Sequence, residues 1–133
     1  MGIVNIRIAL ETALNNMVPA LSTAFENVAF TPPASTVPYQ QCTILFAKPS
    51  NREYGSRHTE LGYMQVDLLY PLQAGSLAAE TRAELVRSTF YRGATFISGG
   101  VTVSIDETPE ISPGSVEGDR WRKQVKIRFS AQI

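Results

Sequence analysis

The chain has 133 residues, of which 12 are Lys or Arg and 12 are Asp or Glu, so its formal net charge is zero. This balance argues against a general nucleic-acid-binding protein, which usually carries a basic excess, and it permits copies of the chain to associate. The length predicts a single domain, residues 1–133, that folds without a disulfide or a metal.

Cys42 and His58 are the only cysteine and the only histidine. An intrachain disulfide is therefore excluded, and a zinc site lacks the ligand cluster that it needs. Cys42 lies in an apolar run and is typical of a buried core residue. We expect no enzyme, no metal and no cofactor.

We find no targeting signal in the sequence. The apolar N-terminal stretch contains Arg7 and Glu11, which a secretory signal does not tolerate. No run approaches the roughly 20 apolar residues of a membrane span. We expect a soluble, cytoplasmic protein without membrane contact.

The first predicted element is a helix that ends before Pro19. Its apolar residues, from Ile3 to Met17, recur at spacings of three and four. A short helical piece over Ala20–Glu26 is expected to follow. Residues 31–38 contain three prolines and predict an extended, stiff segment.

Two strands come next, over Tyr39–Ala47 and Thr59–Tyr70. The polar residues 48–58 between them predict a long loop or the extended tip of a hairpin. A second helix follows Gly75, with Ser76 as its N-terminal cap and Gly93 as the left-handed residue after its end.

Two strands complete the chain. Val101–Asp106 alternates apolar and polar residues, and residues 124–133 alternate strictly, so one face should be buried and one solvated. Residues 108–118 predict a turn-rich linker. The fold class is α+β: a four-stranded, mostly antiparallel (mixed) sheet with two main helices on one face, in the order α-β-β-α-β-β. The second and third strands would be parallel if they were neighbours.

Charge is concentrated in the second half of the chain, where residues 67–133 hold eight bases and eight acids. Five bases crowd the last strand, and five acids precede it. Either these charges pair within the hairpin, or the opposed patches meet between subunits. The bases are Arg120, Arg122, Lys123, Lys126 and Arg128; the acids are Asp106, Glu107, Glu110, Glu117 and Asp119.

Two other functions remain open from the residues. A small hydrolase could use the carboxylates Asp106, Glu107 and Glu110, or His58. A nucleic-acid-binding module could use the basic strip from Arg120 to Arg128. A solvated acidic loop is the simpler interpretation of the carboxylates.

Nearly the whole chain resembles the tail terminator proteins of long-tailed bacteriophages, including the lambda tail terminator and its prophage-encoded relatives. The resemblance is carried by GYMQV at residues 62–66, by Tyr70-Pro71 followed by Gly75, and by FYRG at residues 90–93. It implies a structural protein with no catalytic residues, one that forms a hexameric ring, caps the growing tail tube and ends its polymerisation.

The resemblance also implies the partners: other copies of the chain, the tail tube protein and a head completion protein. It implies no specific nucleic acid, although DNA later passes through the ring. The expected location is the virion tail, after assembly in the bacterial cytoplasm. A head–tail connector or another minor tail component is the alternative. The candidate subunit and tube contacts are Arg52, Tyr54, Arg57, His58, Arg120, Arg122 and Lys126.

Overall fold

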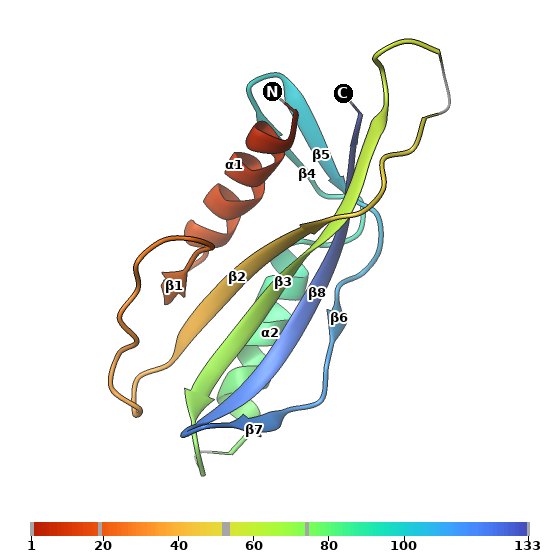
Figure 1. Cartoon of the computed structure of the whole chain (residues 1–133). Coiled ribbons are helices and arrows are strands. Elements are labelled where there is room, and N and C mark those ends of the chain that lie inside the picture. Colours follow the sequence, from red (N-terminus) through yellow and green to blue (C-terminus); the bar gives the residue numbers. More distant parts are fainter. Residues whose placement is uncertain (1, 19, 52–53, 74, 133) are drawn as a thin grey trace.

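The computed structural model describes residues 2–18, 20–51, 54–73 and 75–132 (Figure 1). Two helices and eight strands follow the chain order α1-β1-β2-β3-α2-β4-β5-β6-β7-β8. No helix in the described residues is long and apolar enough to cross a membrane. The elements are α1 (Gly2–Asn15), β1 (Ser22–Ala24), β2 (Tyr39–Phe46), β3 (Thr59–Pro71), α2 (Leu77–Thr89), β4 (Thr95–Ser98), β5 (Val101–Ile105), β6 (Glu110–Ile111), β7 (Ser115–Glu117) and β8 (Arg120–Gln132).

All eight strands belong to one mixed sheet, in the order β1-β2-β3-β8-β5-β4. Among the strand pairs of the described residues, β1–β2 is parallel and the others are antiparallel. The long strands β3 and β8 pair along their entire length, from Thr59 opposite Gln132 to Pro71 opposite Arg120. The other edge of β8 is shared by β5, β6 and β7, which follow one another along it.

The prediction of an α+β fold with a mostly antiparallel sheet is confirmed, but the predicted strand number of four is wrong. β4 was missed because its four residues fit between the helix and the Gly99-Gly100 turn without a long alternation. β6 and β7 lie in the predicted linker, where β8 supplies their hydrogen-bonding partner. The second and third predicted strands are not neighbours, because β8 lies between β3 and β5.

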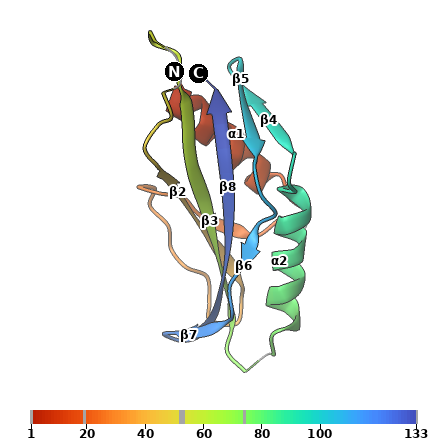
Figure 2. The same cartoon turned by 90° about the vertical axis from the view of Figure 1, so that its right-hand side faces the viewer.

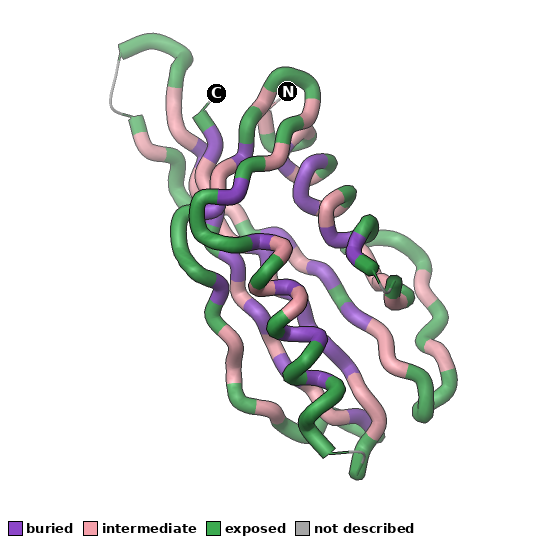
Figure 3. The backbone as a smooth tube through the Cα atoms, turned by 180° about the vertical axis from the view of Figure 1, so that it is seen from behind, coloured by how far each residue is buried: buried purple, intermediate pink, exposed green. Residues whose placement is uncertain are grey.

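Both helices contribute to one hydrophobic core with a single face of the sheet. Ile6, Leu10 and Leu14 of α1 and Val86 of α2 belong to the same buried cluster as β8. Figure 2 shows β4 and β5 displaced from β3 toward the side that α2 occupies, so that the sheet curls. In Figure 3 the buried stripe of each helix faces the sheet and the exposed stripe faces outward. On β8 the strict alternation is confirmed, because its odd-numbered residues from 123 to 131 are buried.

Two local predictions are wrong, and a third, that Gly93 is a left-handed residue after the second helix, is confirmed although the C-cap of that helix lies three residues earlier. Ser22–Ala24, expected to be helical, forms β1 because β2 offers it a parallel partner. Ser76 occupies the N-cap position of α2, but its side chain makes no capping hydrogen bond. The C-cap is Phe90, and Gly93 lies beyond it at φ +92°, where its N–H binds the carbonyl of Ile105.

Candidate assembly surfaces

The sheet face opposite the helices carries two of the predicted contact residues, Arg122 and Lys126. We call it the open face and define it by the residues of β3 and β8 that alternate with the core residues. Its register places β8 cations beside polar β3 residues: Lys126 lies opposite Gln65, and Arg128 lies opposite Tyr63. The open-face residues are Tyr63, Gln65 and Asp67 on β3 and Arg122, Gln124, Lys126 and Arg128 on β8.

Acidic and basic side chains of the open face pair within the chain. Arg122 contacts Glu117 at 2.9 Å and Asp67 at 3.4 Å through its two terminal nitrogens. The Nε of Arg128 lies 3.7 Å from a carboxylate oxygen of Glu107. Each exposed pair of this kind contributes at most about 1 kcal/mol. The opposed charges therefore meet inside the terminal hairpin, as the simpler of the two interpretations predicts.

Lys126 is held by an aromatic ring. Its Nζ lies 4.6 Å from the centre of the Tyr63 ring, and the guanidinium carbon of Arg128 lies 5.9 Å from the same ring. Cations over an aromatic face are attracted by the ring quadrupole. The result is a fixed, partly exposed cationic spot in the middle of the open face.

Arg120 differs from the other candidates because only 5% of it is exposed. Its guanidinium donates hydrogen bonds to the carbonyls of Val37 and Pro33 at 2.6 Å and of Ala34 at 3.0 Å. Its planar group also lies 4.6 Å over the Tyr39 ring. Arg120, the first residue of β8, thus holds the proline-rich segment (residues 31–38) against the sheet. Its charge is therefore satisfied within the chain.

The loop between β2 and β3 forms a protruding hairpin, which we call the arm (residues 47–58) (Figure 1). Ser50 and Thr59 close its base through two backbone hydrogen bonds of 2.9 Å. Tyr54 is fully exposed. The candidate Arg52 lies outside the described residues. The arm therefore presents an aromatic side chain to whatever approaches this end of the sheet.

His58 is fixed at the base of the arm by both ring nitrogens. Nδ1 lies 3.0 Å from the carbonyl oxygen of Ser56, and Nε2 lies 2.8 Å from a carboxylate oxygen of Glu60. The carbonyl of Ser56 and the carboxylate of Glu60 raise the pKa of His58, because both accept hydrogen bonds from the protonated ring. His58 therefore couples the arm to β3 most tightly when it is charged.

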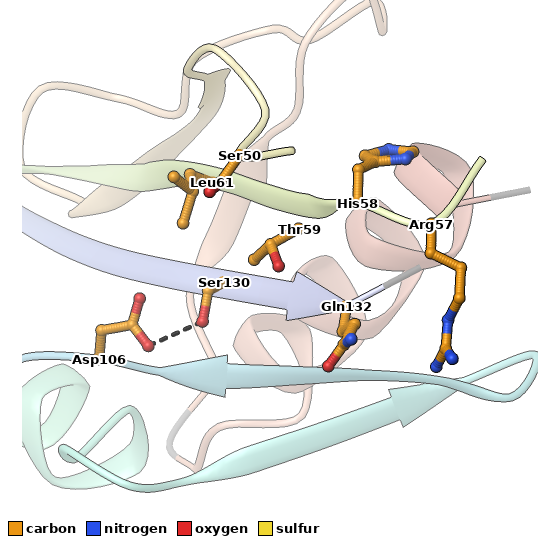
Figure 4. A pocket seen from close by; sticks show the side chains of 8 residues that line it. All are labelled: Ser50, Arg57, His58, Thr59, Leu61, Asp106, Ser130 and Gln132. Atoms are coloured by element: carbon orange, nitrogen blue, oxygen red, sulfur yellow. Dashed lines mark hydrogen bonds between the residues drawn. The ribbon is translucent and has the colours of Figure 1, made fainter. Parts of the chain in front are cut away.

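A groove of about 370 Å³ lies beside the arm, between the ends of β3 and β8 (Figure 4). Arg57 lies at one end beside Gln132, and Asp106 lies at the other end. The carboxylate of Asp106 accepts a 2.8 Å hydrogen bond from the hydroxyl of Ser130. The lining is largely polar, with Ser50, Arg57, His58, Thr59, Leu61, Asp106, Ser130 and Gln132.

The three carboxylates considered for hydrolysis have separate environments. Asp106 binds Ser130, Glu107 contacts Arg128, and Glu110 lies opposite Lys126 in the β6–β8 ladder. Among the described residues, no three His, Cys, Asp or Glu side chains gather as a metal site would require. Nothing in this arrangement combines a general acid with a general base.

Sequence reasoning missed a buried polar chain beneath α2. Arg82 is only 4% exposed, and its Nη2 lies 3.5 Å from Oε1 of Gln40. The amide of Gln40 in turn donates to Thr23 of β1 at 2.9 Å. Burial lowers the pKa of Arg82. One sequence signal could have indicated that Arg82 is buried. It precedes Ala83 and so lies on the edge of the apolar stripe of α2.

Together these features describe a small α+β domain whose distinctive surfaces, an arm and a charged open face, are suited to contacts with other chains. The comparisons with known proteins give the family. The model of the phage tail terminator protein family matches residues 5–129, and the chain belongs to this family. The resemblance seen in the sequence is therefore confirmed.

Solved structures share the fold. Nine solved chains match. One of them, which carries no functional name, superimposes with a TM-score of 0.82 at 25% sequence identity, covering 100% of this chain and 97% of its own. No curated protein sequence matches the chain. A structural role in the phage tail thus follows from the family match.

Proposed function

We propose that this protein caps the phage tail tube, ends its polymerisation and forms the tail-side surface to which the head is joined. The observation that carries the proposal is the tail terminator family match over residues 5–129. The protein would act in the virion tail, after assembly in the bacterial cytoplasm. Its partners would be the tail tube protein on one side and a head completion protein on the other.

The proposed working form is a ring of six copies. A ring needs a heterologous interface, in which one surface of a subunit contacts a different surface of the next. The neutral net charge supports association, since copies do not repel one another. The exposed Tyr54 and the arginines of the open face, Arg122 and Arg128, supply residue types that are enriched at such interfaces.

A head–tail connector or another minor tail component is the alternative in the same class. The test is deletion of the gene from the phage, with tails examined by electron microscopy. Loss of a terminator gives overlong tails, and a plasmid copy restores the normal length. Tails of normal length that fail to join heads would support the connector and overturn the terminator.

Nucleic-acid binding through the basic strip is disfavoured by the contacts of its members. Arg120 is buried against backbone carbonyls, and Arg122 and Arg128 face carboxylates. Phosphate binding would require these pairs to be broken. We expect no DNA binding by the purified protein, even at low salt, and strong salt-dependent binding would overturn this expectation.

A further inference from the structure

Arg57 is the charged residue of the groove that stays available for a partner. Within the described ranges, its guanidinium makes no hydrogen bond and no ion pair. It lines the groove of Figure 4 and also a second, adjoining hollow of about 470 Å³ over Gly100, Thr102 and Ser104. A guanidinium flanked by polar groups is suited to bind a carboxylate through two parallel hydrogen bonds.

The surroundings of Arg57 favour an anionic group. Thr59 and Gln132 line both hollows with it and offer an O–H and an amide N–H as further donors. Asp106, the acid of the groove, lies at its opposite end and is held by Ser130 (Figure 4). A carboxylate bound at Arg57 would therefore lie near hydrogen-bond donors and away from the negative charge of Asp106.

The exposed carboxylates without an ion-pair partner among the described residues are those of Glu84, Asp106, Glu110 and Asp119. Asp106 lines the groove of Arg57 itself and is held by Ser130, so it is not a candidate for the group that enters from another copy. Glu110 lies directly opposite Lys126 across the β6–β8 ladder, and Glu84 lies one helical turn from Arg87. These cations compensate both carboxylates in part.

Asp119 has no such compensation. It occupies the turn between β7 and β8, beside two arginines whose side chains are occupied elsewhere. Arg120 is directed to the carbonyls of the proline-rich segment, and Arg122 contacts Glu117 and Asp67. Asp119 is thus an exposed negative charge at a protruding turn.

Asp119 and Arg57 cannot meet within one molecule. β8 starts at Arg120, next to Asp119, and ends at Gln132, beside Arg57. Thirteen extended residues separate the two ends by about 40 Å, at about 3.3 Å per residue. A contact between them must join two copies, and it is heterologous because it uses a different end of each.

We propose that Asp119 of one copy binds Arg57 in the groove of the next, joining copies head to tail. The proposal rests on the proposed ring, to which it gives one interface. It places β8 along the circumference of the ring, with the β7–β8 turn of each subunit inserted beside the arm of its neighbour.

The test is cross-linking of cysteines placed near the two residues, so that both charges of the proposed ion pair are kept. The exposed positions are Ser56, next to Arg57, and Val116 of β7, in the same hairpin as Asp119. Their Cα atoms would lie farther apart than the roughly 7 Å limit of a disulfide, so a bis-maleimide with a flexible spacer is used. The native Cys42 does not interfere, because it is buried and burial raises its pKa to about 12. The variants are S56C, V116C and the double variant, and the reaction is run on concentrated protein and on isolated tails.

The double variant should give a ladder of cross-linked species, because each chain carries both halves of the contact. A one-to-one mixture of the single variants should stop at dimers, and each single variant alone should stay uncross-linked. Strong cross-linking of one single variant would show a symmetric contact and overturn the proposal. A double variant that remains uncross-linked in both preparations would overturn it as well.

Charge reversal identifies the pair. R57E and D119R should each weaken self-association about tenfold, and the combination should restore it. R92E, which reverses an exposed arginine outside the groove, is the matched control and should have no effect. Rescue of R57E by E84R or E110R in place of D119R would assign the contact to another carboxylate and overturn the proposal. Normal tail length after gene deletion would instead reject the terminator function, whatever the cross-linking shows.

Discussion

The carboxylate of Glu26 accepts a hydrogen bond from the backbone N–H of Ile44, with 2.7 Å between oxygen and nitrogen. Ile44 lies in β2, whose outer edge is covered by the short strand β1 only over residues 39–41. Arg7 of α1 holds the same carboxylate oxygen at 3.0 Å. The uncovered part of the edge is therefore closed by a charged side chain, and a charged edge resists pairing with another chain.

Replacing Glu26 by alanine should expose this edge and lower the stability of the fold. The Ile44 N–H loses its acceptor and Arg7 loses an ion pair, so we expect a cost of about 1–2 kcal/mol in the free energy of unfolding. Urea denaturation followed by circular dichroism measures it. Glu26→Gln keeps an oxygen acceptor without the charge and should cost less; equal losses for both variants would contradict the hydrogen-bond account.

The same site predicts a dependence on acid. Burial alone would raise the pKa of Glu26, but hydrogen bonds from Ile44 and Arg7 outweigh it, so the pKa is lowered. A lowered pKa means that the carboxylate stabilises the fold above its unfolded pKa, and that this contribution is lost as the pH falls through its folded pKa. The difference in stability between the wild type and Glu26→Gln should therefore shrink in acid. A difference that is constant with pH would exclude the carboxylate as its source.

Arg120 should matter more for stability than its neighbour Arg122. Arg120→Ala leaves the carbonyls of Pro33, Ala34 and Val37 without their donor in a largely buried site. We expect a loss of about 2–4 kcal/mol, with early proteolysis of the proline-rich segment. Arg122→Ala removes an exposed ion pair with Glu117 and a partly buried one with Asp67, which keeps its hydrogen bond from Gln65. It should cost about 1–2 kcal/mol, less than Arg120→Ala. Denaturation of the two variants side by side decides; similar losses would show that the carbonyl contacts are weak.

These two arginines also show how far the sequence could predict the surface. Arg120 and Arg122 share a strand and a face, so pattern alone groups them as contact residues. They differ because the proline-rich segment contacts Arg120, although 83 to 87 residues of sequence lie between the bonded groups. Such contacts depend on how the segment folds back, and no local pattern records that.

For the fold, local signals sufficed where they were long. The strict alternation of β8 and the helical spacing of α1 predicted their type and their buried face. β1 failed because three residues carry too little pattern, and pairing with β2 overrode their helical spacing. Strand order failed because β8 inserts between β3 and β5, a long-range choice set by the core and not by neighbouring residues.

His58 should titrate above its ordinary range. The carbonyl of Ser56 and the carboxylate of Glu60 raise its pKa, so its charged form fixes the arm fully below the unfolded pKa, and this contribution is lost as the pH rises through the folded pKa. Because His58 is the only histidine, its ring protons give one clear NMR titration, with a midpoint above about 6.5. Glu60→Gln should lower the midpoint, and an unchanged midpoint would remove Glu60 from the account.

Gly62 should not tolerate even a methyl group. It lies between Phe46 of β2 and Phe129 of β8 in the sheet, and the two rings meet edge to face over it, with centroids 5.8 Å apart. A Cβ at this position would overlap the carbonyl oxygen of Leu45 and lie 3.0 Å from the Phe129 ring. The absence of a side chain is what lets the two rings pack.

Gly62→Ala should therefore destabilise the fold by about 1–3 kcal/mol, the usual cost of overpacking, although Gly→Ala normally stabilises a strand. Thermal denaturation measures the change. The control is the same substitution made in a Phe129→Leu variant, which lacks the aromatic ring. If the ring alone caused the clash, Gly62→Ala would cost little stability in that variant. The overlap with the Leu45 carbonyl remains in that background, so we expect most of the penalty to persist. A neutral Gly62→Ala in either background would show that β2 and β3 can separate locally at this point.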